Sequence, residues 1–160
     1  MASNFSFLTQ EQQNELPEAQ TLESRSGKLH LRFYTCCAYE FALPAVGIRE
    51  VLSTSPDRIT PIPNTSPLLL GTINFRGQAV WVADLGQFLG EADYLNTDRA
   101  EIPVIAIEDQ EVTVGLAVDR IVGMDWLDPD EVQISTNISD NLAPFLKGEW
   151  LVDKDTHQWV

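Results

Sequence analysis

The sequence predicts an all-β protein that folds as two small barrels. At least eight short apolar segments are separated by frequent turns, several of them alternate apolar and polar residues, and no segment keeps the period of a long helix. The predicted strands divide about equally on either side of residues 91–101, a polar and acidic stretch without alternation. We therefore expect two barrel subdomains joined near 91–101.

The chain opens with a polar segment, residues 1–27, which has too few large apolar groups to offset the entropy lost on ordering. We expect a disordered tail there and a folded domain over 28–160. The first strand starts near Lys28. Its inward-facing set is expected to be Leu29, Leu31 and Phe33, and its outward-facing set His30, Arg32 and Tyr34.

Short helical turns and stiff loops are expected between the next strands. Residues 45–48 are too few for more than one helical turn, and the three prolines within 61–67 exclude a central strand. Asp84 is expected to cap a short helix that runs to Leu89 and stops at Gly90.

The remaining strands are expected mostly as hairpins. Their ranges are 41–43, 50–52, 71–75 with 79–83 around a turn at 76–78, 102–107 with 112–118 around a turn at 108–110, 121–123, and 149–152 with 158–160 around a turn at 153–155. Residues 142–146 are expected to form a short turn-like segment.

Composition limits the classes of partner. The formal net charge is -14 and the acids are dispersed, so the surface repels phosphate backbones and we expect no nucleic-acid partner. The start of the sequence does not resemble a signal peptide, and no apolar stretch approaches the length of about 20 residues that crosses a bilayer. Cys36 and Cys37 are adjacent and suit a reducing compartment. We expect a soluble, cytoplasmic protein without membrane insertion.

The sequence shows no pattern of residues that supports catalysis. It has two histidines, His30 and His157, no nucleophile-elbow pattern and no zinc-ligand spacing. The acidic stretch 125–131 lacks the ligand spacing of an EF-hand and is interpreted as a solvated turn, which leaves an enzyme as the weakest hypothesis. We expect no catalytic residues, no metal and no cofactor, and a surface made to bind protein.

Four segments resemble the CheW-like chemotaxis adaptor family. Residues 41–51 (FALPAVGIREV), followed by 59–64 (ITPIPN), are similar to the family's opening. Residues 71–78 (GTINFRGQ) resemble its Gly-x-Ile-Asn-Leu-Arg-Gly segment, with Phe75 at the usual leucine, and 115–121 (GLAVDRI) resemble its Gly-x-x-Val-Asp segment. The resemblance runs from about Lys28 to the end of the sequence. It implies two five-stranded β-barrels sharing a hydrophobic core.

The resemblance also implies a function and a site. It implies a non-catalytic adaptor that couples the regulatory domain of a CheA-type histidine kinase to the cytoplasmic tips of methyl-accepting receptors, in membrane-associated arrays. Glu50 and Arg76 align with family charges near the receptor-binding groove, and Val46 and Ile48 would add apolar contact there. Glu50 and Arg76 could instead form an exposed ion pair without a partner role.

Two further expectations concern an alternative function and the end of the sequence. A structural protein of the same family could bind the kinase or other CheW-like domains, forming rings or competing for the kinase, without coupling to receptors. The family also usually continues with more strand and a short helix beyond the point at which this sequence stops, Trp159-Val160. If the natural protein ends there, the second barrel must be closed differently; if the sequence is cut short, its stability is in doubt.

Overall fold

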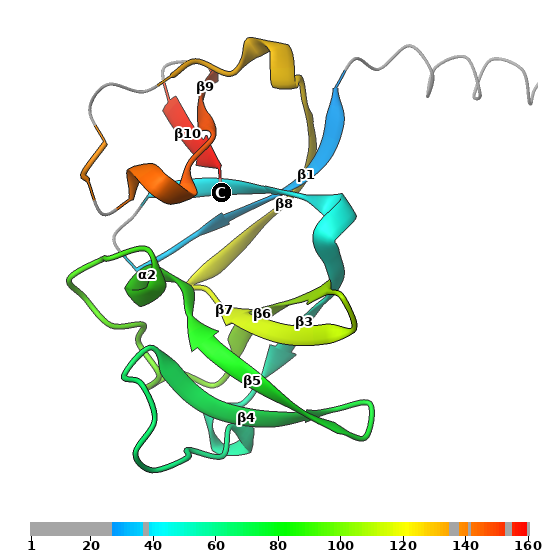
Figure 1. The fold of residues 1–160 in the computed structure, drawn as a ribbon, viewed down its shortest axis with the longest axis vertical. Coiled ribbons are helices and arrows are strands. Elements are labelled where there is room, and N and C mark those ends of the chain that lie inside the picture. The colour runs from blue at the N-terminus through cyan, green and yellow to red at the C-terminus, as the bar shows by residue number, and fades with distance from the viewer. Residues whose placement is uncertain (1–26, 37–38, 135–137, 141, 153–154, 160) are drawn as a thin grey trace, which may run out of the picture.

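The computed structural model describes residues 27–36, 39–134, 138–140, 142–152 and 155–159 (Figure 1). The predicted tail, apart from Gly27, and Cys37 lie outside the described residues. The strands are β1 (Lys28–Tyr34), β2 (Glu40–Pro44), β3 (Ile48–Thr54), β4 (Leu69–Phe75), β5 (Gln78–Asp84), β6 (Ile102–Asp109), β7 (Val112–Ala117), β8 (Arg120–Leu127), β9 (Gly148–Val152) and β10 (Asp155–Trp159).

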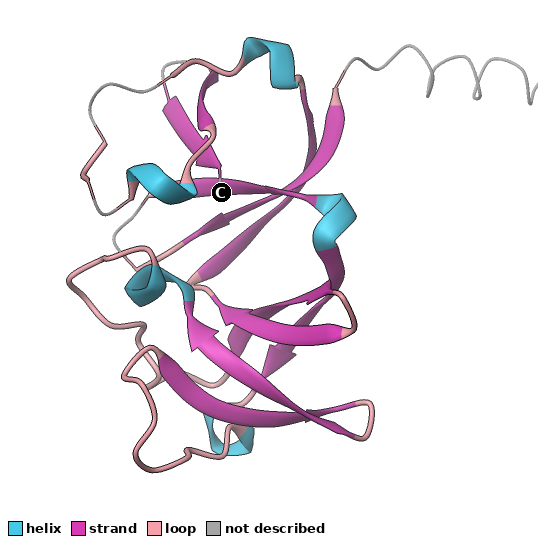
Figure 2. Cartoon of the chain, in the orientation of Figure 1, coloured by secondary structure: helices cyan, strands magenta, loops and turns pink. Residues whose placement is uncertain are grey.

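The helical elements are single turns. They are η1 (Ala45–Gly47), η2 (Pro56–Arg58), α2 (Leu85–Phe88), η3 (Pro129–Glu131) and η4 (Ala143–Phe145). Figure 2 shows them as short caps between the strands. No helix in the described part of the chain has the length and apolar character needed to cross a membrane.

The strands form two five-stranded sheets. Sheet A has the order β8-β1-β2-β10-β9 and sheet B has the order β3-β6-β7-β5-β4. In each sheet a residue beyond one outer strand bridges to the other outer strand: Thr60 pairs with Thr72 in sheet B, and Gln133 pairs with Glu149 in sheet A. These bridges close each sheet on itself. The predicted class, all-β with two five-stranded units, is therefore confirmed.

The joint between the two units differs from the prediction. Residues 91–101 connect α2 to β6, and the strands on both sides of them, β5 and β6, belong to sheet B. The chain instead crosses from sheet A to sheet B at η1 and returns between β7 and β8. The even spacing of strands was misleading, because pairing between β1 and β8 joins segments far apart in the sequence.

The two sheets share a core. Leu31, Phe33 and Phe41 of sheet A pack with Leu85, Leu89, Ile105 and Val118. A second cluster fills sheet B around Ile73, Val82 and Val104. A third and smaller cluster in sheet A joins Ala42, Leu127 and Trp150. Because the largest shared cluster draws on both sheets, neither unit would keep its apolar surface covered alone.

His30 is buried, which corrects the prediction that it faces outward. Its side chain is fully buried, its ring meets Trp150 edge-on with the ring centroids 5.2 Å apart, and its Nδ1 lies 2.7 Å from the carbonyl oxygen of Lys28. The alternation along β1 is correct, but sheet A closes on itself. The face opposite the shared core therefore becomes a second interior.

A charged network lies on the same side of sheet A. Arg32 Nε donates to the buried Glu40 carboxylate at 2.6 Å, Arg32 Nη1 pairs with Asp125 at 3.2 Å, and the Tyr34 hydroxyl donates to Glu40 at 3.0 Å. Partial burial lowers the pKa of Arg32, but the hydrogen bond and charge of Glu40, with the charge of Asp125, outweigh it and raise that pKa above its ordinary value. The network is therefore held with Arg32 charged.

Candidate protein-binding site

Glu50 and Arg76 form an ion pair, with Arg76 Nη2 and Glu50 Oε2 2.7 Å apart. Glu50 lies on β3, and Arg76 lies in the turn between β4 and β5. β3 and β4 are the two outer strands of sheet B, and closure of the sheet brings them together. The side chains are 65% exposed for Arg76 and 38% exposed for Glu50, so both charges remain open to solvent and to a partner.

Arg76 occupies a left-handed backbone conformation, with φ of 49°, and Gly77 follows it with φ of 81°. Two successive positive φ values are typical of the type I′ hairpin turn, whose first central position favours asparagine. The Asn74 side chain accepts from the Gly77 backbone N–H at 3.0 Å and supports the turn. Arginine is thus a poor choice for this backbone. Its presence points to a use for the side chain.

The aromatic ring of Phe75 lies next to the arginine of the ion pair. This ring belongs to the core of sheet B, and the guanidinium carbons of Arg49 and Arg76 lie 5.5 and 5.4 Å from its centroid. Arg49 also reaches Glu108 at 3.4 Å and Thr113 at 3.1 Å. This end of sheet B therefore presents a rim of alternating charges around a covered aromatic ring.

A β-bulge explains why Arg49 joins the rim. Ile48 pairs with Ile107 and Glu50 pairs with Ala106, which leaves Arg49 as an extra residue on β3. Arg49 was not among the residues expected at the site, and strict alternation along a strand would place Arg49 and Glu50 on opposite faces. No pattern of residues in the sequence predicts this bulge.

The two predicted apolar residues differ in accessibility. Val46, on η1, is 94% exposed and free to contact a partner. Ile48 is half-buried and packs against the shared core, so most of its apolar surface serves the fold.

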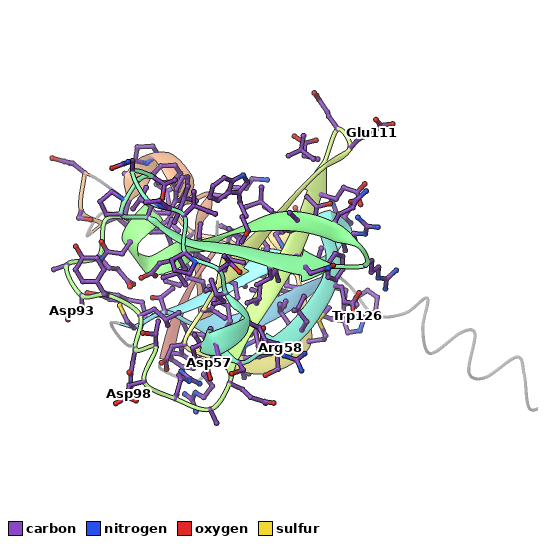
Figure 3. The ribbon with its side chains drawn as sticks, turned by 90° about the horizontal axis from the view of Figure 1, so that it is seen from below. Asp57, Arg58, Asp93, Asp98, Glu111 and Trp126 are labelled. Carbon is purple, nitrogen blue, oxygen red and sulfur yellow. The ribbon has the colours of Figure 1, made fainter. Side chains whose placement is uncertain are left out.

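Other apolar residues near the shared core were missed. Val51 on β3 is exposed although it pairs with the buried Ile105, and Met124 on the outer strand β8 is exposed although it pairs with the buried Leu31. Directly paired residues share a face, so Val51 and Met124 extend the shared core out to solvent at the sheet edges. Trp126 is exposed on the same strand (Figure 3). Residues 121–127 are apolar at every position except Gly123 and Asp125, so both faces of this strand carry apolar residues and no alternation indicates which face is exposed.

The remaining sequence candidates have ordinary structural surroundings. Asp125 pairs with Arg32, and the Asp128 carboxylate accepts from the Asp130 backbone N–H at 2.9 Å, which caps η3. The Cys36 thiol lies 3.0 Å from the Glu91 carboxylate. Among the residues that the structure describes, no three or more His, Cys, Asp or Glu side chains gather as a metal site would require.

Residues 33–159 match the family model described as CheW-like domain, and this range holds Glu50, Arg76, all of sheet B and sheet A from Phe33 onward. The chain belongs to the CheW-like domain family. The recognition made from the sequence is therefore confirmed, and with it the all-β class.

Curated relatives agree with this membership, and a solved structure shares the fold. The chain is 31% identical over 91 residues to "Chemotaxis protein CheW" of Thermotoga maritima, an alignment that covers 56% of this chain and 57% of that protein. It is 30% identical over 119 residues to "Protein PilI" of Pseudomonas aeruginosa, covering 70% of this chain and 65% of the relative. The fold also matches scaffolding protein TtCheW from Thermoanaerobacter tengcongensis, with a TM-score of 0.70, 22% identity, and coverage of 83% of this chain and 88% of that one.

Proposed function

We propose that this CheW-like chain is a non-catalytic signalling adaptor, which couples a CheA-type histidine kinase to methyl-accepting receptors. The kinase partner would be its regulatory domain, and the receptor partner its cytoplasmic tip. The relatives named Chemotaxis protein CheW and Protein PilI support a role in chemotaxis-type or pilus signalling. On this proposal the chain works in the cytoplasm at membrane-associated receptor arrays.

The Glu50–Arg76 ion pair is the observation that carries the proposal. A left-handed backbone costs a non-glycine residue about 1–2 kcal/mol, whereas an exposed ion pair contributes at most about 1 kcal/mol to stability. The fold therefore gains little from arginine at position 76. A partner that meets the two charges would explain why this residue stands in a turn that suits asparagine.

Exposed apolar residues support a protein partner at the same side of the molecule. Figure 1 shows the start of β3, η1 and the tips of the β4–β5 and β6–β7 hairpins together on one side. Val46 and Val51 lie on η1 and β3, and Met124 lies on β8, which contacts β6. Apolar contact next to a few charges is the usual composition of a protein interface. We propose that the receptor tip binds over this surface.

Titration calorimetry tests the proposal. The chain is titrated with the kinase regulatory domain and, separately, with the receptor tip from its own organism. We expect binding of the receptor tip in the micromolar range, and a loss of about tenfold or more for Arg76→Glu, because that variant places two acids together. Arg58→Glu is the matched control, since Arg58 is also exposed but lies on η2, and it should bind within about twofold of wild type.

Two outcomes would count against coupling. If the folded chain binds neither partner, the adaptor proposal fails. If it binds the kinase and only lowers receptor-stimulated phosphorylation, the chain is a competing or ring-forming member of the family.

A further inference from the structure

Residues 91–101 connect α2 to β6, and we call them the strap. The first half of the strap is fixed to the unit of sheet B. Leu95 is buried in the core of sheet B, and its backbone N–H donates to the buried Asp84 carboxylate at 2.9 Å. The Gln87 side-chain amide, on α2, donates to the carbonyl oxygen of Glu91 at 3.0 Å. These contacts hold the strap against sheet B.

The Glu91 side chain reaches from the strap to the connection between β1 and β2 of sheet A. The Thr35 hydroxyl donates to one oxygen of the Glu91 carboxylate, and the Cys36 thiol lies 3.0 Å from the other oxygen. Thr35 directly follows β1 and is buried, and its backbone N–H donates to the carbonyl oxygen of Tyr39 at 3.4 Å. A hydrogen bond to a carboxylate is stronger than one between neutral groups. Glu91 therefore fastens the strap to sheet A.

The other end of the strap is fastened where the chain returns from sheet B to sheet A. Arg99 Nη1 donates to the Asp119 carboxylate at 3.0 Å, and Arg99 Nε donates to the carbonyl oxygen of Glu101 at 2.9 Å. Asp119 lies between β7 and β8, and its backbone N–H donates to the carbonyl oxygen of Tyr34 at 2.9 Å. Both fastenings therefore lead to the end of β1, at Tyr34 and Thr35.

The strap and η1 lie on opposite sides of the boundary between the two sheets. Figure 1 shows the end of β1 with α2 on the left, and η1 on the right. The crossing through η1 adds no packed side chain, because none of its residues is buried and Val46 is 94% exposed. Burial of the shared core favours contact between the sheets but is non-directional, whereas the hydrogen bonds of the strap have a defined geometry.

We propose that the strap sets the angle between the two sheets and thereby positions the two halves of the binding surface. Val51, on β3, belongs to sheet B, and Met124, on β8, belongs to sheet A, so a rotation about η1 would move one relative to the other. Thr35, Glu91 and Arg99 are positioning residues in this scheme. The angle is a property of the chain alone, whereas its effect on receptor binding rests on the proposed function.

Residual dipolar couplings of the full chain measure the angle, because the amide vectors of each sheet report how that sheet is aligned. The test variant combines Thr35→Val, which removes the hydroxyl and keeps the shape, with Arg99→Met, which removes the guanidinium. We expect each sheet to keep its internal geometry, and the orientation of one relative to the other to change beyond the error of the wild-type fit. Affinity for the receptor tip, measured by calorimetry, should fall about threefold or more.

Arg99→Met alone is the milder variant, because the Arg99 side chain is partly exposed and its loss leaves the buried Thr35 in place. We expect a smaller change of the angle in the same direction. Thr35→Ser with Arg99→Lys keeps the hydroxyl and the charge, and this pair should preserve most of the wild-type orientation. A role in stability alone would instead lower the denaturation midpoint without changing the angle.

Ser53→Ala is the matched control. The Ser53 hydroxyl donates to the Glu101 carboxylate at 2.9 Å, so this variant also removes a side-chain hydrogen bond of the strap. Ser53 lies on β3, however, and the bond stays within the unit of sheet B. We expect the wild-type angle and a receptor affinity within about twofold of wild type.

Three results would overturn the proposal. The first is an unchanged angle in folded Arg99→Met and in the double variant. The second is an equal change of the angle in Ser53→Ala, which would mean that any weakening of sheet B has this effect. The third is a changed angle with an undiminished affinity for the receptor tip, which would remove the positioning role. Failure of the wild type to bind the receptor tip would contradict the proposed function, and the couplings would still decide whether the strap sets the angle.

Discussion

Replacing Arg76 by asparagine separates the folding role of this residue from its proposed binding role. The variant loses the 2.7 Å ion pair with Glu50 and the contact with the Phe75 ring at 5.4 Å. At exposed sites these contribute at most about 1 kcal/mol and about 0.5–1 kcal/mol. The variant gains an Asn-Gly turn, because asparagine tolerates the φ of 49° better than arginine, and this relief is worth about 1 kcal/mol.

These opposing effects nearly cancel in the free energy of unfolding. We expect Arg76→Asn to change it by less than about 1 kcal/mol, which corresponds to a shift in Tm of about 4 °C or less. Urea and thermal denaturation measure this change. The affinity for the receptor tip, measured by calorimetry on the same sample, should fall about tenfold.

A charge-swapped variant sharpens the test. Glu50→Arg with Arg76→Glu restores the intramolecular ion pair but reverses the charges that a partner would meet. We expect near wild-type stability and weakened receptor binding. A loss of several kcal/mol of stability in Arg76→Asn, or binding of the receptor tip by both variants as tight as that of wild type, would contradict a binding role for Arg76.

Three further predictions concern the scaffold. Arg32→Met should lower the free energy of unfolding by about 2–3 kcal/mol in urea denaturation, because the buried Glu40 carboxylate loses its ion pair; a change below about 0.5 kcal/mol would contradict this role. Glu111→Gly should raise stability by about 0.5–1 kcal/mol, since Glu111 has φ of 67° in the β6–β7 turn, and a loss of stability would show that its side chain compensates. Gly86→Ala should speed amide exchange in the 91–95 loop, because the added methyl group would displace the Glu91 carboxylate; unchanged exchange would mean that this carboxylate does not hold the loop.

Local structure followed from the sequence where one residue type controls it. Asp84 caps α2 as expected, since an N-cap needs only a short acceptor followed by backbone N–H groups. The turn after Phe75 also falls within the expected residues 76–78, because Gly77 supplies a positive φ. Leu31 and Phe33 are buried as alternation along β1 predicts.

Long-range pairing did not follow from the sequence. The chain returns to sheet A after β7, and nothing in the spacing of strands indicates that β1 lies beside β8 or that β10 runs parallel to β2. His30 was misplaced for the same reason: alternation gives two faces, but only the closed sheet shows that both are covered.

The candidate site was reached partly through family resemblance. Glu50 and Arg76 lie on different strands, and no pattern in the sequence pairs them. Their ion pair needs closure of sheet B. Arg49 was missed because a β-bulge changes the side of the strand on which it lies. Val51 was missed because its exposure depends on which other segments cover β3, and the sequence does not show this.

The most direct test of the proposed coupling is co-sedimentation. Receptor-bearing membranes are mixed with the isolated regulatory domain of the kinase, with and without this chain, and the pellet is assayed for the kinase domain. We expect the kinase domain to sediment only when the chain is present, and we expect Arg76→Glu to abolish this recovery while Arg58→Glu preserves it. Equal sedimentation with and without the folded chain, or recovery undiminished by Arg76→Glu, would contradict the proposed coupling.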